Sequence, residues 1–352
     1  MVGAGVLGAA LARALARAGA GVTLVEQHMP DDLRAASVAR SRILRAAHGA
    51  EVAETRSARE ARRLWLELEH DTDTDIYSEV GIAWFAPARG AAWEVESRRV
   101  LETEGAPVEA LSPHEAGRLF PELAADDLDH VLLEREAGLL RPRAALRALL
   151  VDATRHGAEL VRGRATPAGA EAELGSRLLG ADRIVWACGA WTPALFPELV
   201  HGAVIQQDVL YLDVPQAWAT PGVPAWGAYA EAATGAGDFG GDGFKIGLDV
   251  PGRPTDPDVL DRAPIRDHEE RARRYLARRF PRLASARRRA IECCQTVVLE
   301  PRLGKPDTVL GGEVRLVRHP EHESVWLLGD GSGHAFKHAP AIGAVVCDRL
   351  CA

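Results

Sequence analysis

Apolar residues along the chain follow two spacings, one typical of helices and one typical of buried strands. After Gly8, alanines and leucines recur at helical spacing up to Arg17, and a short apolar run at 22–25 follows. This order predicts a helix and then a buried strand. Further helices are predicted at residues 56–70, 92–120 with a break at Pro107, 139–153, 265–281 and from about 341. Further strands are predicted at residues 77–85, 158–161, 183–187, 203–213, 244–248, 290–299 and 325–330.

The turn before the first predicted helix carries Gly3, Gly5 and Gly8 in the spacing G-x-G-x-x-G. In this pattern the first glycine allows a tight turn, the second lets the backbone approach a pyrophosphate, and the third lets the helix pack on a strand. The helix N-terminus offers N–H groups and a positive dipole end to phosphates. Glu26, which ends the next strand, suits ribose hydroxyls and favours FAD or NAD over NADP. We interpret the segment as a dinucleotide-binding turn; the alternative is a glycine-rich turn with a structural role.

Only Met1 and Val2 precede Gly3, although this motif normally follows a buried strand. We therefore expect either that this strand is truncated or that the natural start of the protein lies upstream. A missing central strand would leave backbone groups unpaired in the middle of a sheet, so we expect poor stability.

Signals of nucleotide-binding βαβ units occur at the start, in the middle and at the end of the chain. This distribution predicts one domain assembled from separate segments, with a second domain inserted into it. The expected fold class is α/β, a Rossmann-like dinucleotide-binding domain with an inserted α+β substrate domain built on a mixed sheet. The expected boundaries are 1–75, 141–200 and 319–352 for the first domain, and 76–140 and 201–318 for the second.

The composition is that of an ordinary soluble protein and excludes several classes. The 352 residues carry a net charge of −8, so no basic field is available to hold nucleic acid or an anionic membrane. No run of 18 apolar residues occurs, and no basic segment precedes the apolar start, so we expect neither a membrane span nor a signal peptide. Of the 42 basic residues only three are lysines, Lys245, Lys305 and Lys337, which codon bias explains.

The five cysteines, at positions 188, 293, 294, 347 and 351, are odd in number and form no C-x-x-C pair. This pattern indicates neither a disulfide framework nor a zinc site, so no metal is expected and a cytoplasmic, reducing compartment fits best. We expect a monomer or a weak homo-oligomer.

Five segments together resemble the D-amino-acid-oxidase-like FAD oxidoreductases, most closely the monomeric sarcosine oxidase group. They are the glycine turn, the Ser41-Arg42-Ile-Leu-Arg45 loop with His48-Gly49, Cys188-Gly-Ala-Trp191, Gly243-Phe-Lys-Ile-Gly247, and His319-Pro-Glu-His322 with the glycine-rich run from Gly329 to Lys337. The resemblance extends over nearly the whole chain. It implies a flavoenzyme with FAD as cofactor, and a small-molecule amine or amino acid and O₂ as its partners.

The family's chemistry implied by this resemblance is oxidation of an amine or of an amino or imino acid. A hydride passes from the carbon next to nitrogen to the flavin, and O₂ reoxidises the flavin to give H₂O₂. By this resemblance Arg45 and Lys337 hold the substrate carboxylate, for which arginine supplies a bidentate fork and lysine a point charge. Arg42 lies beside the flavin, and Lys245 activates O₂ by stabilising the negative charge of superoxide. A solvated basic loop for the two arginines, or an outward-facing lysine, is the structural alternative.

The resemblance also assigns further cofactor-binding positions besides Gly3, Gly5, Gly8, Glu26, Arg42 and Lys337. They are Val6, Leu7, Gln27, Ser41, Cys188, Gly189, Trp191, Cys294, Gly329, Gly331, Gly333, His334 and Phe336. Cys294 is the better match, compared with Cys293, to the cysteine that links the flavin covalently in sarcosine oxidases. Thr296 stands where the family has an aromatic residue, so a covalent link and a plain buried cysteine both remain open.

Two substrate-pocket positions depart from the family. Asp249 and Val38 stand where the family has histidines, and the match of Tyr229 to the family's pocket tyrosine is open. These departures argue against a small N-methyl amino acid and favour a larger or cyclic amino or imino acid. A dehydrogenase that uses an acceptor other than O₂, or a catalytically decayed flavoprotein, is the alternative; an NAD-dependent dehydrogenase fits less well.

Overall fold

The structure, a computed structural model, describes residues 1–30, 32–250, 252–259, 263–299, 308–310, 314–329 and 333–352. Its helices are α1 (Val6–Arg17), α2 (Val52–Thr72), α3 (Ala92–Thr103), α4 (Pro113–Ala116), α5 (Pro142–Arg155), α6 (Thr192–Leu195), α7 (Arg266–Arg279) and α8 (Ala335–Cys351). Its short 3₁₀ segments are η1 (Gly189–Trp191), η2 (Gln216–Trp218), η3 (Tyr229–Glu231) and η4 (Pro281–Leu283).

The strands are short except for β13 and β18. They are β1 (Thr23–Glu26), β2 (Arg42–Leu44), β3 (Tyr77–Glu79), β4 (Ile82–Pro87), β5 (Val108–Leu111), β6 (Leu128–Glu134), β7 (Gly138–Leu140), β8 (Glu159–Arg162), β9 (Ala165–Ala168), β10 (Glu171–Leu174), β11 (Arg177–Leu179), β12 (Ile184–Trp186), β13 (Gly202–Leu212), β14 (Ala225–Ala228), β15 (Ala233–Ala236), β16 (Phe244–Leu248), β17 (Arg253–Pro254), β18 (Arg288–Leu299), β19 (Thr308–Leu310), β20 (Val314–Arg318) and β21 (Val325–Gly329). Among the described residues, no helix is both long enough and apolar enough to cross a bilayer.

Val2 connects two small sheets into one nucleotide-binding sheet. It forms parallel bridges with Val25 of β1 on one side and Trp186 of β12 on the other. Strand β1 also pairs with β8, and β12 continues into β21, β20 and β19. The expected unpaired ladder is therefore not found around Val2: its N–H donates to Val185, its carbonyl accepts from Ala187, and both distances are 2.8 Å.

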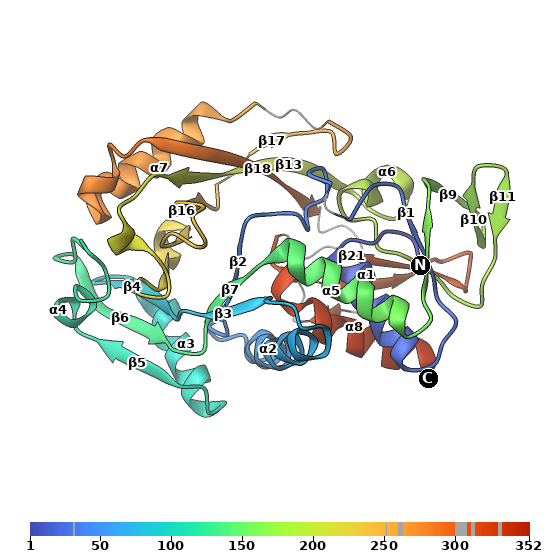
Figure 1. Cartoon of the computed structure of the whole chain (residues 1–352), viewed down its shortest axis with the longest axis horizontal. Coiled ribbons are helices and arrows are strands. Elements are labelled where there is room, and N and C mark those ends of the chain that lie inside the picture. The colour runs from blue at the N-terminus through green and yellow to red at the C-terminus, as the bar shows by residue number, and fades with distance from the viewer. Residues whose placement is uncertain (31, 251, 260–262, 300–307, 311–313, 330–332) are drawn as a thin grey trace.

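Helices α1, α5 and α8 lie beside this sheet at one end of the molecule, and strands β4 to β6 with α3 and α4 lie at the other (Figure 1). Helices α1 and α8 approach very closely because α8 carries Gly343 at the contact. A Cβ on Gly343 would lie 2.7 Å from the backbone of Ala10. The buried alanines of α1, among them Ala9 and Ala12, allow the same close packing.

A nine-stranded mixed sheet forms the other half of the molecule, in the order β17-β13-β16-β15-β14-β4-β6-β5 with β18 on β13. Its core is a cluster of stacked and edge-on aromatic rings around Trp226, Phe244 and Phe280. Alternation along β16 places Phe244 and Ile246 in this core and turns Lys245 to the opposite face. The expected α/β class with a mixed-sheet second part is confirmed.

Two predictions about individual elements were wrong. The segment at 92–120 is not helical on both sides of the predicted break at Pro107, because residues 108–111 pair with β6 as strand β5. Helix α8 begins at Ala335 rather than near 341, and Pro340 lies inside it. Strands β19 and β20, which the expected boundary at 318 places in the second domain, pair with β21 in the nucleotide-binding sheet.

A buried ion pair joins α1 to α5. Arg13 Nε donates to Asp152 Oδ2 at 2.7 Å, and the two side chains are 8% and 4% exposed. Replacing Asp152 with alanine leaves the Arg13 charge buried without this partner, so we expect a loss of about 3–5 kcal/mol in the free energy of unfolding. Denaturant unfolding of the Asp152→Ala variant and the unaltered protein measures this loss.

The matched control replaces Glu109, which pairs with the exposed Arg135 at 2.8 Å and has no contact with Arg13. Because ion pairs at the surface contribute little, we expect Glu109→Ala to cost less than about 1 kcal/mol. Equal losses for the two variants would show that burial of the Arg13 pair does not matter.

Candidate functional site

A cavity of about 860 Å³ runs between the nucleotide-binding sheet and the nine-stranded sheet. Clefts of roughly 300–1,000 Å³ are usual for cofactors and small ligands. The glycine turn borders the cavity, and Arg45, Trp84, Lys245 and Lys337 belong to the same lining. One cavity thus brings together the dinucleotide motif and the candidate catalytic residues.

Steric constraints explain the glycines of the turn. Gly3 has a φ of 95°, and a Cβ on it would lie 2.5 Å from the Ala187 carbonyl oxygen. A Cβ on Gly8 would overlap the Gly3 carbonyl oxygen. The chain at Gly3 therefore passes close to the end of β12 and enters α1 through Gly5, whose own conformation is extended.

Two polar side chains hold this turn from outside α1. Ser37 Oγ accepts a hydrogen bond from the N–H of Val6 at 2.9 Å. The Glu26 carboxylate accepts from the N–H of Ala4 at 2.6 Å and from the N–H of His28 at 2.9 Å. Glu26 therefore fixes the turn to the end of β1 while it also lines the cavity.

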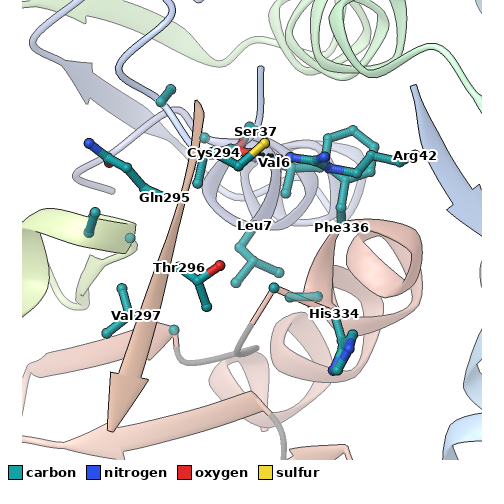
Figure 2. Close-up of a pocket in the computed structure, with 18 of the residues that line it drawn as sticks. Val6, Leu7, Ser37, Arg42, Cys294, Gln295, Thr296, Val297, His334 and Phe336 are labelled. Carbon is teal, nitrogen blue, oxygen red and sulfur yellow. Dashed lines mark hydrogen bonds between the residues drawn. The ribbon is translucent and has the colours of Figure 1, made fainter. Parts of the chain in front are cut away.

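Three neighbouring strands present one face of the large sheet to the cavity. Val209 of β13 is opposite Gly247 of β16 and Glu292 of β18, and Cys294 and Thr296 follow at alternate positions of β18. Figure 2 shows Cys294 and Thr296 on the same side of β18, with Leu7 and Arg42 on that side and Gln295 on the other. Alternation therefore selects Cys294, not Cys293, as the cysteine that lines the cavity.

Lys245 is a buried cation in this wall. Its Nζ donates to the carbonyl oxygen of Ser41 at 2.9 Å and to Ser41 Oγ at 3.3 Å. Burial, and then the charge of nearby Arg42, lower the pKa of Lys245 to about 8. Glu292 opposes this shift, and it accepts a hydrogen bond from the hydroxyl of Tyr211 at 3.0 Å.

The Cys294 thiol lies in the field of two cations. Burial raises its pKa, because the thiolate is poorly solvated there, whereas Arg42 and Lys245 act in the opposite direction. The net shift is upward, so the thiol form prevails at neutral pH.

Arg45 and Lys337 also line the cavity. The Arg45 guanidinium lies over two indole rings, 5.2 Å from the centroid of Trp84 and 5.8 Å from that of Trp93, and donates to the Ala47 carbonyl oxygen. Lys337, in the first turn of α8, is only 5% exposed. Two cations at a buried site provide the charge that a carboxylate ligand needs.

A pair of histidines adjoins these cations. His48 and His338 have ring centroids 5.5 Å apart. Burial, together with Arg45 and Lys337, holds the pKa of each ring well below its usual value. Both rings are therefore neutral at neutral pH, and the positive charge of the site resides on the arginine and the lysine.

Most of the residues predicted from the sequence line the cavity. They are Gly3, Gly5, Val6, Leu7, Glu26, Gln27, Arg42, Arg45, Cys188, Gly189, Trp191, Lys245, Cys294, Gly329, Gly333, His334, Phe336 and Lys337. Gly8 and Ser41 do not: Gly8 packs behind the turn, and Ser41 holds Lys245. Gly331 and Lys305 lie outside the described residues.

Sequence reasoning missed several residues at the site because no motif marks them. Trp65 of α2 donates through Nε1 to the Lys337 carbonyl oxygen at 2.9 Å and stacks on Phe336, which fixes the start of α8. Trp84 and Trp93 lie beside the Arg45 guanidinium. The apolar pattern of residues 82–85 predicted the strand that carries Trp84 but not which face its indole takes.

The cavity suits FAD. The glycine turn with the N-terminus of α1 meets the needs of a pyrophosphate, and Glu26 lies where ribose hydroxyls bind in such turns. The same lining includes the cations Arg42, Arg45 and Lys245.

Comparisons with known proteins agree with this geometry. Residues 1–349 match the family described as FAD dependent oxidoreductase. The chain is 24% identical to monomeric sarcosine oxidase of Bacillus sp. (strain B-0618), covering 98% of this chain and 90% of the relative. It is 25% identical to N-methyl-L-tryptophan oxidase of Escherichia coli O81 (strain ED1a), covering 99% and 93%.

The solved structure of L-proline dehydrogenase from P. horikoshii has the same fold. It superposes with a TM-score of 0.81 at 18% identity and covers 99% of this chain and 91% of that one. The match over nearly the entire length, with the dinucleotide turn in place, shows that the chain belongs to the FAD-dependent oxidoreductase family.

Proposed function

We propose that the protein oxidises the carbon–nitrogen bond of an amine, or of an amino or imino acid, and passes the electrons to O₂ to give H₂O₂. The observation that carries this proposal is the pair of cations Arg45 and Lys337 in the same cavity as the dinucleotide turn. The pair suits a carboxylate, and the names of the relatives above support the amine class.

Each residue has a role in this proposal. The bound FAD would accept the hydride, and Arg45 and Lys337 hold the substrate carboxylate so that its neighbouring carbon is presented to the cofactor. Lys245 supplies the fixed positive charge for O₂ reduction, and Arg42 lies beside it. The turn residues Gly3 and Gly5 bind the pyrophosphate.

We also propose the division into two domains, with β19 and β20 added to the FAD-binding part because they pair with β21. A monomer or weak homo-oligomer in the cytoplasm remains part of the proposal. The cysteine pattern, odd in number and without a C-x-x-C pair, supports the cytoplasm.

The test begins with the absorbance spectrum of the purified protein, in which bound flavin is visible. An anaerobic screen of amines and amino acids then identifies the compound that bleaches the flavin, and readmitted air should yield one H₂O₂ per substrate oxidised. Bleaching without peroxide on reoxidation would support a dehydrogenase, and FAD that no compound bleaches would support a decayed flavoprotein.

Cys294 allows a separate prediction about how FAD is held. Because burial raises the pKa of the Cys294 thiol, little thiolate forms, and we expect FAD to be bound without a covalent link. Acid precipitation should then leave a yellow supernatant. A yellow pellet that Cys294→Ser abolishes and Cys293→Ser retains would contradict the prediction.

A further inference from the structure

Three aromatic rings form a continuous wall of the cavity leading to Arg45. Tyr229 and Trp93 stack with centroids 4.5 Å apart and an interplanar angle of 7°. Trp93 and Trp84 follow at 4.7 Å and 59°. All three rings line the cavity, and the first is 55% exposed whereas Trp84 is 2% exposed. The wall therefore runs from the solvent side of the cavity to the buried Trp84, over which the Arg45 guanidinium lies.

The wall is built from segments that are distant in sequence. Trp93 opens α3, Trp84 lies in β4, and Tyr229 opens η3. The Trp93 indole lies against the backbone of Gly49, where a Cβ would be 2.8 Å from its Cδ1 atom. This close contact restricts the indole to one position beside Arg45.

The remaining lining next to the wall leaves room for a large group. Ala228, Ala232, Ala233 and Thr234, all small, line the cavity just after or beside η3. None of these four side chains is charged. A substrate held by its carboxylate at Arg45 thus has apolar space and flat aromatic surface within reach, but no ionic partner along the run.

We propose that this aromatic wall is a binding subsite for a flat unsaturated ring on the substrate, so that the preferred substrate is an aromatic or ring-bearing amino acid. This rests on the proposed function for the oxidation and on the wall itself for the choice of substrate. Stacking between rings favours such a substrate over one that carries only a methyl group.

The test uses carboxylates that the enzyme cannot oxidise. Their binding to the FAD-loaded protein is measured from the shift of the flavin absorbance. Indole-3-acetate carries a ring, and acetate is the matched ligand without one. We expect indole-3-acetate to bind at least about tenfold more tightly than acetate. Equal dissociation constants for the two ligands would overturn the proposal.

Two variants separate the parts of the wall. Tyr229→Ala removes the ring that stacks on Trp93 and leaves Trp84 and Trp93 beside Arg45, so we expect weaker indole-3-acetate binding by about fivefold and little change for acetate. Trp93→Ala also removes a support of Arg45, so we expect weaker binding of both ligands.

Two further variants are controls. Tyr229→Phe retains the ring and should retain the preference for indole-3-acetate. Leu178→Ala, on the exposed strand β11, controls for a substitution at the surface. An unchanged preference in Tyr229→Ala would contradict the role of Tyr229.

The outcome of this experiment can be told apart from a failure of the proposed function. If an amino acid bleaches the flavin but the ring gives no binding advantage, the oxidation stands and the subsite is wrong. If the ring preference is found but no amine or amino acid bleaches the flavin, the subsite stands and the proposed oxidation is wrong.

Discussion

Replacing Lys245 with methionine is expected to leave FAD bound while slowing reoxidation of the reduced enzyme by O₂ about 100-fold or more. The lysine is buried in the cavity wall and held by Ser41, so its charge is fixed before O₂ arrives. Removing one preorganised electrostatic group from a buried site typically costs about 10²–10³ in rate. Stopped-flow mixing of the reduced protein with O₂ measures the effect.

The rate of reoxidation by O₂ is also expected to depend on pH. The pKa of Lys245 is about 8, so its positive charge is present below pH 8 and is lost as the pH rises through that value. The reoxidation rate should therefore fall on the alkaline side of pH 8, and the profile of Lys245→Met should be flat there. Lys245→Arg keeps a cation and should move the fall to higher pH. An unchanged rate of reoxidation by O₂ in Lys245→Met would contradict this role for Lys245.

Replacing Arg45 with alanine is expected to lower kcat/KM for a carboxylate substrate by about 100-fold. The variant removes the proposed partner of the substrate carboxylate and leaves the buried Lys337 as the remaining cation. Truncating one partner of such a cation–carboxylate pair costs about 2–5 kcal/mol. Steady-state kinetics on the substrate found in the anaerobic screen measures the loss.

Arg45→Lys distinguishes charge from geometry. Lysine restores the charge but not the planar fork, nor the stacking on Trp84 and Trp93, so we expect only partial recovery. Arg56, on the surface of α2 and 68% exposed, is the matched control. If Arg45→Ala and Arg56→Ala gave the same kcat/KM, the carboxylate clamp would be refuted.

Patterns within single segments predicted much of the fold and the cofactor half of the cavity. The glycine turn and Glu26 follow one another within 26 residues, and their spacing corresponds to a fixed local geometry. The prediction that residues 92–120 are helical was wrong for the opposite reason. None of residues 108–111 is buried, and their pairing with β6 decides that they form a strand.

The residues of the cavity that are proposed to bind the substrate could be predicted only in part. Alternation along β18 distinguishes Cys294 from Cys293 once the sheet is known, but the sequence does not state which face meets the cavity. Tyr229 and Trp93 are separated by more than a hundred residues and meet only through the folding of β4 against β14. Ser41, which the resemblance assigns to the cofactor, accepts hydrogen bonds from Lys245 Nζ, a contact that depends on the proximity of β16.

The central claim is that one cavity holds FAD together with an amino acid gripped by its carboxylate. Anaerobic bleaching of the bound flavin by matched pairs of compounds tests it most directly. N-methyl-L-tryptophan is one such compound, and N-methyltryptamine is the same amine without the carboxylate. The account predicts rapid bleaching by the amino acid and bleaching slower by about 100-fold or more by the amine, with the difference lost in Arg45→Ala. Equal bleaching by the two compounds in the unaltered protein would contradict it.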